Sequence, residues 1–171
     1  MRRLVAALCL VLALAAPVSG APISTDVDTL TSIAEWAGCE AVTVEEDDML
    51  NAFFAVDPYG QPYIFIGTQF PEEHRLTVFL HELGHCLQYM DGSFVQMDSE
   101  IRELDADGRS AQLACALHMN GPRMVYDLFV WVHETFGYEG DEGHGTLAQR
   151  IEQGNHAKGW CPNVQAPLLQ A

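Results

Sequence analysis

The chain has 171 residues, of which 49% are hydrophobic and 19% are charged. This length suits a single domain with a sizeable core, and the composition excludes an intrinsically disordered chain. Eight lysines and arginines stand against 24 acidic residues, which gives a formal net charge of −16. A chain this acidic repels phosphate backbones and anionic bilayers, so we expect neither nucleic acid nor a membrane surface as a partner.

The first twenty residues have the layout of a secretory signal peptide. Two arginines follow the first methionine, an apolar run covers Leu4 to Ala16, and small residues lead to Gly20. The run has 13 residues, fewer than the ~20 that a membrane-spanning helix needs. We therefore predict cleavage after Gly20 and one exported domain over 21–171, periplasmic or extracellular and without a membrane span.

Four cysteines remain in the predicted mature domain: Cys39, Cys86, Cys115 and Cys161. An even number of cysteines in an exported chain indicates two disulfides. Three pairings are open. We favour Cys86 with Cys115, and Cys39 with Cys161, because the first two fall on neighbouring predicted helices.

The domain is predicted to begin with a helix and a strand. Polar caps at Ser24–Asp26 precede apolar residues at helical spacing, and this pattern predicts a helix that ends near Gly38. A short strand is expected over 41–44, followed by a solvated acidic turn over 45–48.

A β-hairpin and a long helix are expected next. Phe53–Val56 and Tyr63–Ile66 have strand-like composition, and the turn signal Asp57–Gly60 lies between them. Pro71 and two glutamates then open a helix that ends at Gly92, since acidic residues favour the positive end of the helix dipole.

The second half of the chain is predicted to be helical. A helix from about 99 to 119 is stopped by the Asn-Gly-Pro sequence at 120–122, and another runs from 123 to about 136. A glycine- and acid-rich loop over 137–145 and a short helix near 146–153 precede an irregular tail. Together the elements predict a mostly helical α+β domain with a small antiparallel sheet.

The sequence H-E-L-G-H at 81–85 falls inside the predicted long helix. Residues four apart lie on one face of a helix, so His81 and His85 can bind one zinc ion. Glu82 points beside the metal, where it can act as a general base on a water molecule. Apolar residues flank both histidines, and an unligated pair would be costly to bury there.

A catalytic zinc site usually takes a third protein ligand, here expected from the next helix. Glu103 is the candidate, and Glu100 and Asp105 are the alternatives. Asp107 shares the face of Glu103 and can accept the free N–H of a ligating histidine, which fixes the tautomer of the imidazole. Ala106 between them allows the two helices to approach closely.

These segments resemble the gluzincin metallopeptidases, in particular the CAAX prenyl proteases and the HtpX-like proteases. The resemblance covers Asn51–Phe53, the strand Tyr63–Gly67, the zinc helix at 81–85, the E-x-x-A-D motif Glu103–Asp107 and an H-x-x-x-x-x-R segment at 144–150. It implies a minimal, secreted zincin-like domain with its core over 51–154, because the chain lacks the membrane helices that many members carry.

The resemblance also implies roles for particular residues. Zinc would be held by His81, His85 and Glu103, with Asp107 supporting a histidine. His144 would steady the oxyanion, and Arg150 would orient the loop that carries it. Gly145 departs from the family pattern, which has proline at that position.

The expected function is therefore that of an exported zinc-dependent peptidase with a polypeptide substrate, which would lie along the strand 63–67. One alternative is a non-catalytic, zinc-stabilised binding or assembly protein of the periplasm, a pseudo-protease. Another is a disulfide-stabilised exported domain without metal. Glu82 favours the peptidase, because a purely structural zinc site needs no base and closes its fourth position.

Overall fold

The computed structural model describes residues 23–39 and 42–161, so the predicted signal peptide over 1–20 lies outside the described residues. The predicted α+β class is confirmed. In chain order the elements are α1 (Val27–Ala37), β1 (Thr43–Asp47), β2 (Ala52–Val56), β3 (Pro62–Gly67), α2 (Glu72–Asp91), α3 (Ser99–Ala116), α4 (Gly121–Phe136), β4 (Gly140–Asp141), β5 (Gly145–Thr146), α5 (Leu147–His156) and the 3₁₀ helix η1 (Ala157–Trp160).

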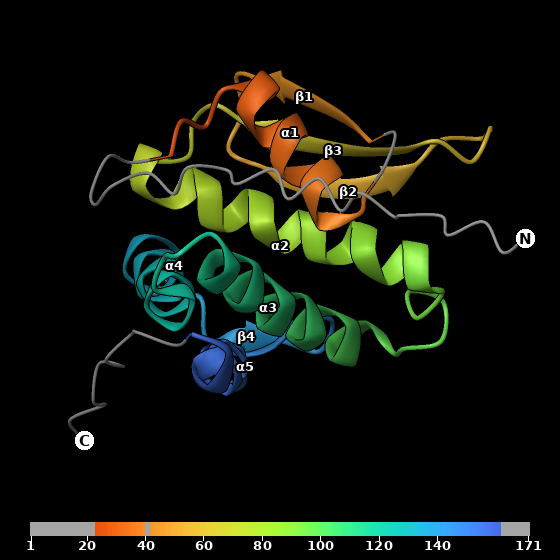
Figure 1. The fold of residues 1–171 in the computed structure, drawn as a ribbon. Coiled ribbons are helices and arrows are strands. Elements are labelled where there is room, and N and C mark those ends of the chain that lie inside the picture. Colours follow the sequence, from red (N-terminus) through yellow and green to blue (C-terminus); the bar gives the residue numbers. More distant parts are fainter. Residues whose placement is uncertain (1–22, 40–41, 162–171) are drawn as a thin grey trace, which may run out of the picture.

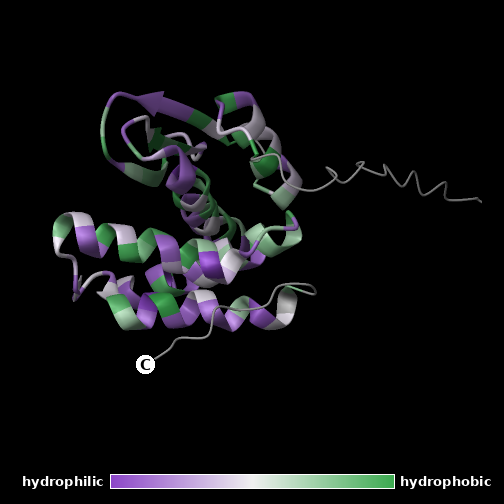
Figure 2. Ribbon diagram, turned by 90° about the vertical axis from the view of Figure 1, so that its left-hand side faces the viewer, coloured by the Kyte–Doolittle hydropathy of each residue, from purple (hydrophilic) through white to green (hydrophobic). Residues whose placement is uncertain are grey.

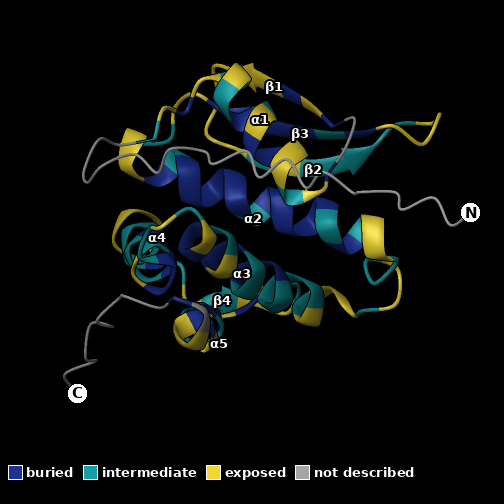
Figure 3. Ribbon diagram, in the orientation of Figure 1, coloured by how far each residue is buried: buried dark blue, intermediate teal, exposed yellow. Residues whose placement is uncertain are grey.

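Helix α2 lies at the centre of the fold, with the three-stranded sheet on one side and α3 on the other (Figure 1). Because it is covered on both sides, most of its length is buried (Figure 3). Phe79, Leu80 and Leu83 join Ile64 and Ile66 of β3 in the main hydrophobic core. Burying each such side chain contributes about 1.5–3 kcal/mol, so α2 is held rigidly along its length.

The sheet has the strand order β1-β3-β2 and is mixed. β2 and β3 form the predicted antiparallel hairpin, but β1 runs parallel to β3, so the prediction of an antiparallel sheet is only partly right. The predicted acidic turn at 45–48 is also wrong for its first three residues. They continue β1 with exposed, hydrophilic side chains (Figure 2), and charge on an edge strand discourages pairing with other chains.

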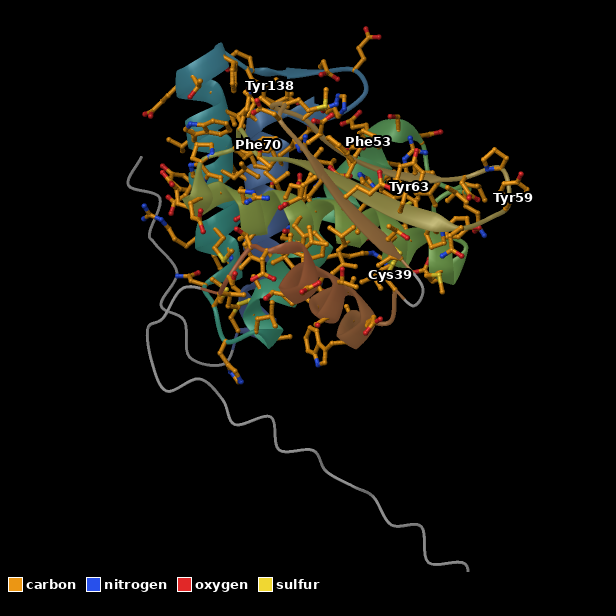
Figure 4. All side chains as sticks on the ribbon, turned by 90° about the horizontal axis from the view of Figure 1, so that it is seen from above. Cys39, Phe53, Tyr59, Tyr63, Phe70 and Tyr138 are labelled. Atoms are coloured by element: carbon orange, nitrogen blue, oxygen red, sulfur yellow. A yellow bond between two sulfur atoms is a disulfide. The ribbon has the colours of Figure 1, made fainter. Side chains whose placement is uncertain are left out.

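The central position of β3 overturns one expectation. Its backbone pairs with β1 on one side and with β2 on the other, so an extended substrate cannot add to the strand 63–67. Strand β2 is an edge of this sheet instead. Figure 4 views the sheet from outside and shows Phe53 of β2 beside Tyr63 of β3, with Tyr59 at the far end of the hairpin.

Two helix boundaries in the second half of the chain differ from the prediction. Asn120 was expected to help end a helix, but its side chain accepts a hydrogen bond from the N–H of Arg123 and caps α4. α3 ends earlier, at Ala116, and His118 takes a left-handed conformation with φ 62° in the connection. The predicted loop over 137–145 contains the short β4–β5 pair.

Two disulfides are present, as predicted, but the favoured pairing is wrong. The bonds join Cys39 to Cys86 and Cys115 to Cys161, with Cα atoms 6.0 and 4.9 Å apart. Gly38 ends α1 in the left-handed region and turns the chain so that Cys39 lies against α2. The first bond therefore fixes α1 to the helix that carries the H-E-L-G-H sequence.

Among the described residues, no helix is both long enough and apolar enough to cross a lipid bilayer.

The pairing can be checked by digesting the unreduced protein and identifying linked peptides by mass spectrometry. We expect Cys39 linked to Cys86, and Cys115 linked to Cys161. Replacing Cys39 and Cys86 together by serine should lower the free energy of unfolding in urea by about 4 kcal/mol, because each bond closes a loop of almost fifty residues. Peptides linking Cys86 to Cys115 would contradict the structure.

Candidate metal centre

A close crossing of α2 and α3 brings the predicted site residues together. A Cβ atom at Gly84 would lie 3.0 Å from the carbonyl oxygen of Ala106 and 3.1 Å from its Cα. Ala106 is itself fully buried. Small residues on both helices therefore allow backbone contact beside the histidines, since Gly84 directly precedes His85 and lies three positions after His81.

Three side chains converge at this crossing. Nε2 of His81 lies 3.1 Å from Oε2 of Glu103, and Nε2 of His85 lies 3.2 Å from Oε1 of the same carboxylate. One ligand atom from each residue lies within 4.8 Å of the other two. The alternatives to Glu103 point elsewhere, because Glu100 accepts a hydrogen bond from Gln149 and Asp105 pairs with Arg109.

The donor set fits a divalent cation such as zinc. Zinc bonds of about 2.0–2.2 Å in tetrahedral geometry place neighbouring ligand atoms about 3.3 Å apart, close to the two distances given above. Two imidazole nitrogens and one carboxylate are also ligands that zinc takes in three-ligand sites. Both histidines present Nε2 to the cluster, since their Nδ1 atoms are bound elsewhere.

The first histidine is oriented by a buried ion pair. Nδ1–H of His81 donates to Oδ1 of Asp107 over 2.9 Å. Arg150 of α5 donates to both oxygens of that carboxylate, at 2.7 and 3.0 Å, and its guanidinium lies over the Phe129 ring. Asp107 therefore holds His81 as predicted, and Arg150 in turn holds Asp107.

Arg150 also reaches the loop with which the sequence prediction associated it. It shares a hydrogen bond with the side chain of Tyr138, whose hydroxyl donates to the carbonyl oxygen of Gly145 over 3.2 Å. Gly145 has φ +79°, which proline cannot adopt because its ring holds φ near −65°. The backbone at this position therefore suits glycine and excludes proline.

The second histidine is oriented by Gln88, a fully buried residue of α2. Nδ1–H of His85 donates to Oε1 of Gln88 over 2.8 Å. The amide nitrogen of Gln88 donates to the carbonyl oxygen of Arg102 and to Oδ2 of Asp105, each over 2.8 Å. All hydrogen atoms of this amide are therefore used, which fixes its orientation and that of the imidazole.

Glu82 is 7% exposed and lies in a pocket beside the cluster. Burial raises the pKa of its carboxyl group above the ordinary range, and the two neighbouring histidines oppose that shift. The backbone N–H of Phe54, in the edge strand β2, donates to the carboxylate. The lining of the pocket comprises Ala52, Phe53, Phe54, Glu82, His85, Phe94, Arg102, Glu103 and His144.

His144 lies at this pocket, but it is half exposed. Its Nδ1 lies 2.8 Å from Oδ1 of Asp141, which also accepts the backbone N–H of His144. The carboxylate therefore fixes the imidazole from behind, and the ring's other nitrogen makes no hydrogen bond with any described residue.

The pKa values of His81 and Glu103 are strongly shifted in opposite directions. Burial opposes protonation of His81, but hydrogen bonds to Asp107 and Glu103 outweigh it and raise the pKa of His81 to about 10. Burial would raise the pKa of Glu103, whereas hydrogen bonds from both histidines lower it well below its usual range. The carboxylate of Glu103 is thus held as an anion, the form that binds a metal.

Sequence reasoning identified the residues at the crossing and missed several that support them. Five of the nine buried polar or charged side chains in the described residues belong to this region. Only one of the five, Gln88, was not named from the sequence, although it carried a signal that we did not use: it is a polar residue in an apolar helix, three positions after His85. The contacts of Asp141 and Tyr138 have no local signal.

Comparison of the chain with models of known protein families, with curated proteins and with solved structures yields no match.

The helix crossing yields a direct prediction. Gly84→Val should lower the free energy of unfolding by about 1–3 kcal/mol, because the added atoms force the two backbones apart, and it should weaken zinc binding. Gly108→Ala is the matched control on α3, since a Cβ there would lie 3.9 Å from the backbone oxygen of Gln153, an ordinary van der Waals contact. Urea unfolding and competition with a zinc chelator measure the two effects. Unchanged zinc affinity in Gly84→Val would contradict the role of the crossing.

A second prediction concerns Gln88. Gln88→Leu keeps a similar volume but removes the acceptor of the His85 N–H, so zinc affinity should fall by about 10- to 100-fold. Gln112→Leu, on an exposed position of α3, serves as control and should bind zinc like the unaltered protein. Equal affinity in both variants would show that Gln88 does not orient the histidine.

Proposed function

We propose that the chain is an exported zinc-dependent peptidase. The observation that carries this proposal is the convergence of His81, His85 and Glu103 beside the buried carboxylate of Glu82, in one pocket. A site that only stabilises a fold closes its coordination sphere with protein ligands. Here three candidate ligands meet, and a potential general base stands next to them.

The three converging side chains would hold the zinc ion, which when bound supplies Lewis-acid activation of water and of a peptide carbonyl. Glu82 accepts the proton of the attacking water on its carboxylate and then donates it to the leaving amine. The hydrogen bond from Phe54 keeps the carboxylate in place during both transfers. Asp107 and Gln88 keep the two imidazoles in the tautomer that presents Nε2.

His144, which also lines the pocket, is suited to a supporting role. Asp141 accepts a hydrogen bond from its Nδ1–H, and in the imidazolium form of the ring Nε2–H can donate a second hydrogen bond to an oxygen that gains negative charge during the reaction. Donors aimed at such an oxygen typically contribute 10²–10³-fold to the rate. Because the ring is half exposed, a substrate in the pocket can reach it.

The edge strand β2 is the natural place for an extended polypeptide. It lines the pocket through residues 52–54, and the Phe54 amide points to Glu82 rather than to a neighbouring strand. A peptide pairing with an exposed strand edge forms main-chain hydrogen bonds independently of its sequence. Such pairing would pass the scissile bond beside Glu82. This assignment replaces β3, whose two edges are already occupied.

Export is supported by the two disulfides, since such bonds form and persist outside the reducing cytosol. The signal-peptide pattern at 1–20 supports the same compartment from the sequence.

The decisive experiment replaces Glu82 by glutamine in the purified domain. Hydrolysis of an unstructured protein such as casein should fall by about 10²- to 10⁴-fold or more, because the general base is lost. The zinc content should stay at one ion per chain, because Glu82 is not a ligand. Glu73→Gln, at an exposed position in the first turn of the same helix, should retain full activity. Metal analysis and a fluorescence assay of released peptides give both readouts.

The same experiment separates the rival functions. One bound zinc ion with no hydrolysis in the unaltered protein would favour the non-catalytic binding or assembly protein. Absence of bound metal after zinc reconstitution would favour the disulfide-stabilised domain. Full activity in Glu82→Gln would refute the assigned base while leaving the ligands untouched.

A further inference from the structure

Arg102 differs from the other described arginines in having no acidic partner. Four of them, Arg75, Arg109, Arg123 and Arg150, form ion pairs with carboxylates. No described carboxylate lies within 4.0 Å of the Arg102 guanidinium, although the chain has 24 acidic residues and only eight basic ones. An arginine without a countercharge in so acidic a chain requires a different explanation.

The side chain of Arg102 is held at the pocket of the candidate metal centre. Its guanidinium carbon lies 4.5 Å from the centroid of the Phe94 ring, and Nη1 donates to the Phe94 carbonyl oxygen over 3.4 Å. The Phe94 ring is in turn 5.9 Å from the ring of His85. Gln88 binds the Arg102 backbone carbonyl, and Glu103 is the next residue. The guanidinium is therefore placed at a fixed position relative to the three converging side chains.

The guanidinium has donors available for a ligand. It carries five N–H groups, and the structure uses one of them in a hydrogen bond to a described residue. The Phe94 ring covers one face of the plane and leaves its edge for in-plane hydrogen bonds. A planar fork of this kind matches a carboxylate through two parallel hydrogen bonds.

We propose that Arg102 is a specificity-determining residue that receives a substrate carboxylate close to the scissile bond. This inference rests on the proposed peptidase function and names the substrate class of that site. In a polypeptide the carboxylate comes from an aspartate or glutamate side chain or from the C-terminus. The two acidic residues of the pocket, Glu82 and Glu103, face the candidate metal centre. Arg102 is therefore the group that supplies the positive charge for an acidic substrate.

The test uses zinc-loaded protein and a set of peptides that differ only at positions flanking the cleaved bond. Each position carries glutamate, glutamine or lysine, and each peptide is made with a free and an amidated C-terminus. We expect kcat/KM to be about 10- to 100-fold higher for the carboxylate peptide than for its neutral partner, as for a charged hydrogen-bonded pair. Dependence on the glutamate identifies a side-chain carboxylate, and dependence on the free terminus identifies a terminal one.

Arg102 variants test whether this residue makes the selection. In Arg102→Gln, kcat/KM should be about equal for the carboxylate peptide and its neutral partner. Arg102→Lys should retain part of the preference for the carboxylate peptide, and Arg102→Glu should favour the lysine peptide. Arg123→Gln, an exposed arginine of α4, should keep the original ratio. Zinc content and circular dichroism of every variant establish that the site and fold are intact.

The outcomes distinguish this inference from the proposed function. Hydrolysis by the unaltered protein without any carboxylate preference overturns the role of Arg102 and leaves the peptidase proposal standing. The same holds if the preference persists in Arg102→Gln. Absence of hydrolysis for every peptide, with zinc bound, overturns the peptidase proposal and the inference together.

Discussion

The structure depends on one contact between two helix backbones. Gly84 and Ala106 meet where α2 crosses α3, and every group of the candidate metal centre is arranged around that point. Side chains have limited length, so those of two helices can meet at one point only where the helix axes lie close together. A larger residue at position 84 would push the two backbones apart and so move Glu103 away from the histidines.

Around this crossing, the fold accepts an unusual concentration of buried polarity. Charged groups are costly to remove from water unless they are paired and hydrogen-bonded. Here Asp107 is paired with His81 and Arg150, and the buried amide of Gln88 is hydrogen-bonded to His85 and to two oxygens. The sheet and α1 on the other side of α2 provide the apolar burial that compensates for this cost. The centre of the molecule thus contains both the main hydrophobic core and the charged groups that are costly to bury.

How much could be predicted from the sequence depended on the range of the interaction. Helical periodicity placed His81 and His85 on one face, and the same rule placed Glu103 with Asp107, since both are local relations. The parallel pairing of β1 with β3 was missed because strand pairing is non-local. Cysteine pairing failed for a similar reason, because the distance from Cys39 to Cys86 depends on how α1 packs on α2. Arg102 was not singled out, because the lack of an acidic partner becomes visible only in three dimensions.

The ion pair between Asp107 and Arg150 has a consequence for the order in which the protein matures. A ribosome makes the chain from its amino end, so Asp107 is synthesised more than forty residues before its countercharge. Until α5 docks, the interior carboxylate lacks its guanidinium and the histidine that it supports is poorly fixed. A defined arrangement of the candidate ligands is therefore a late event, completed only when α5 packs on α3 and α4.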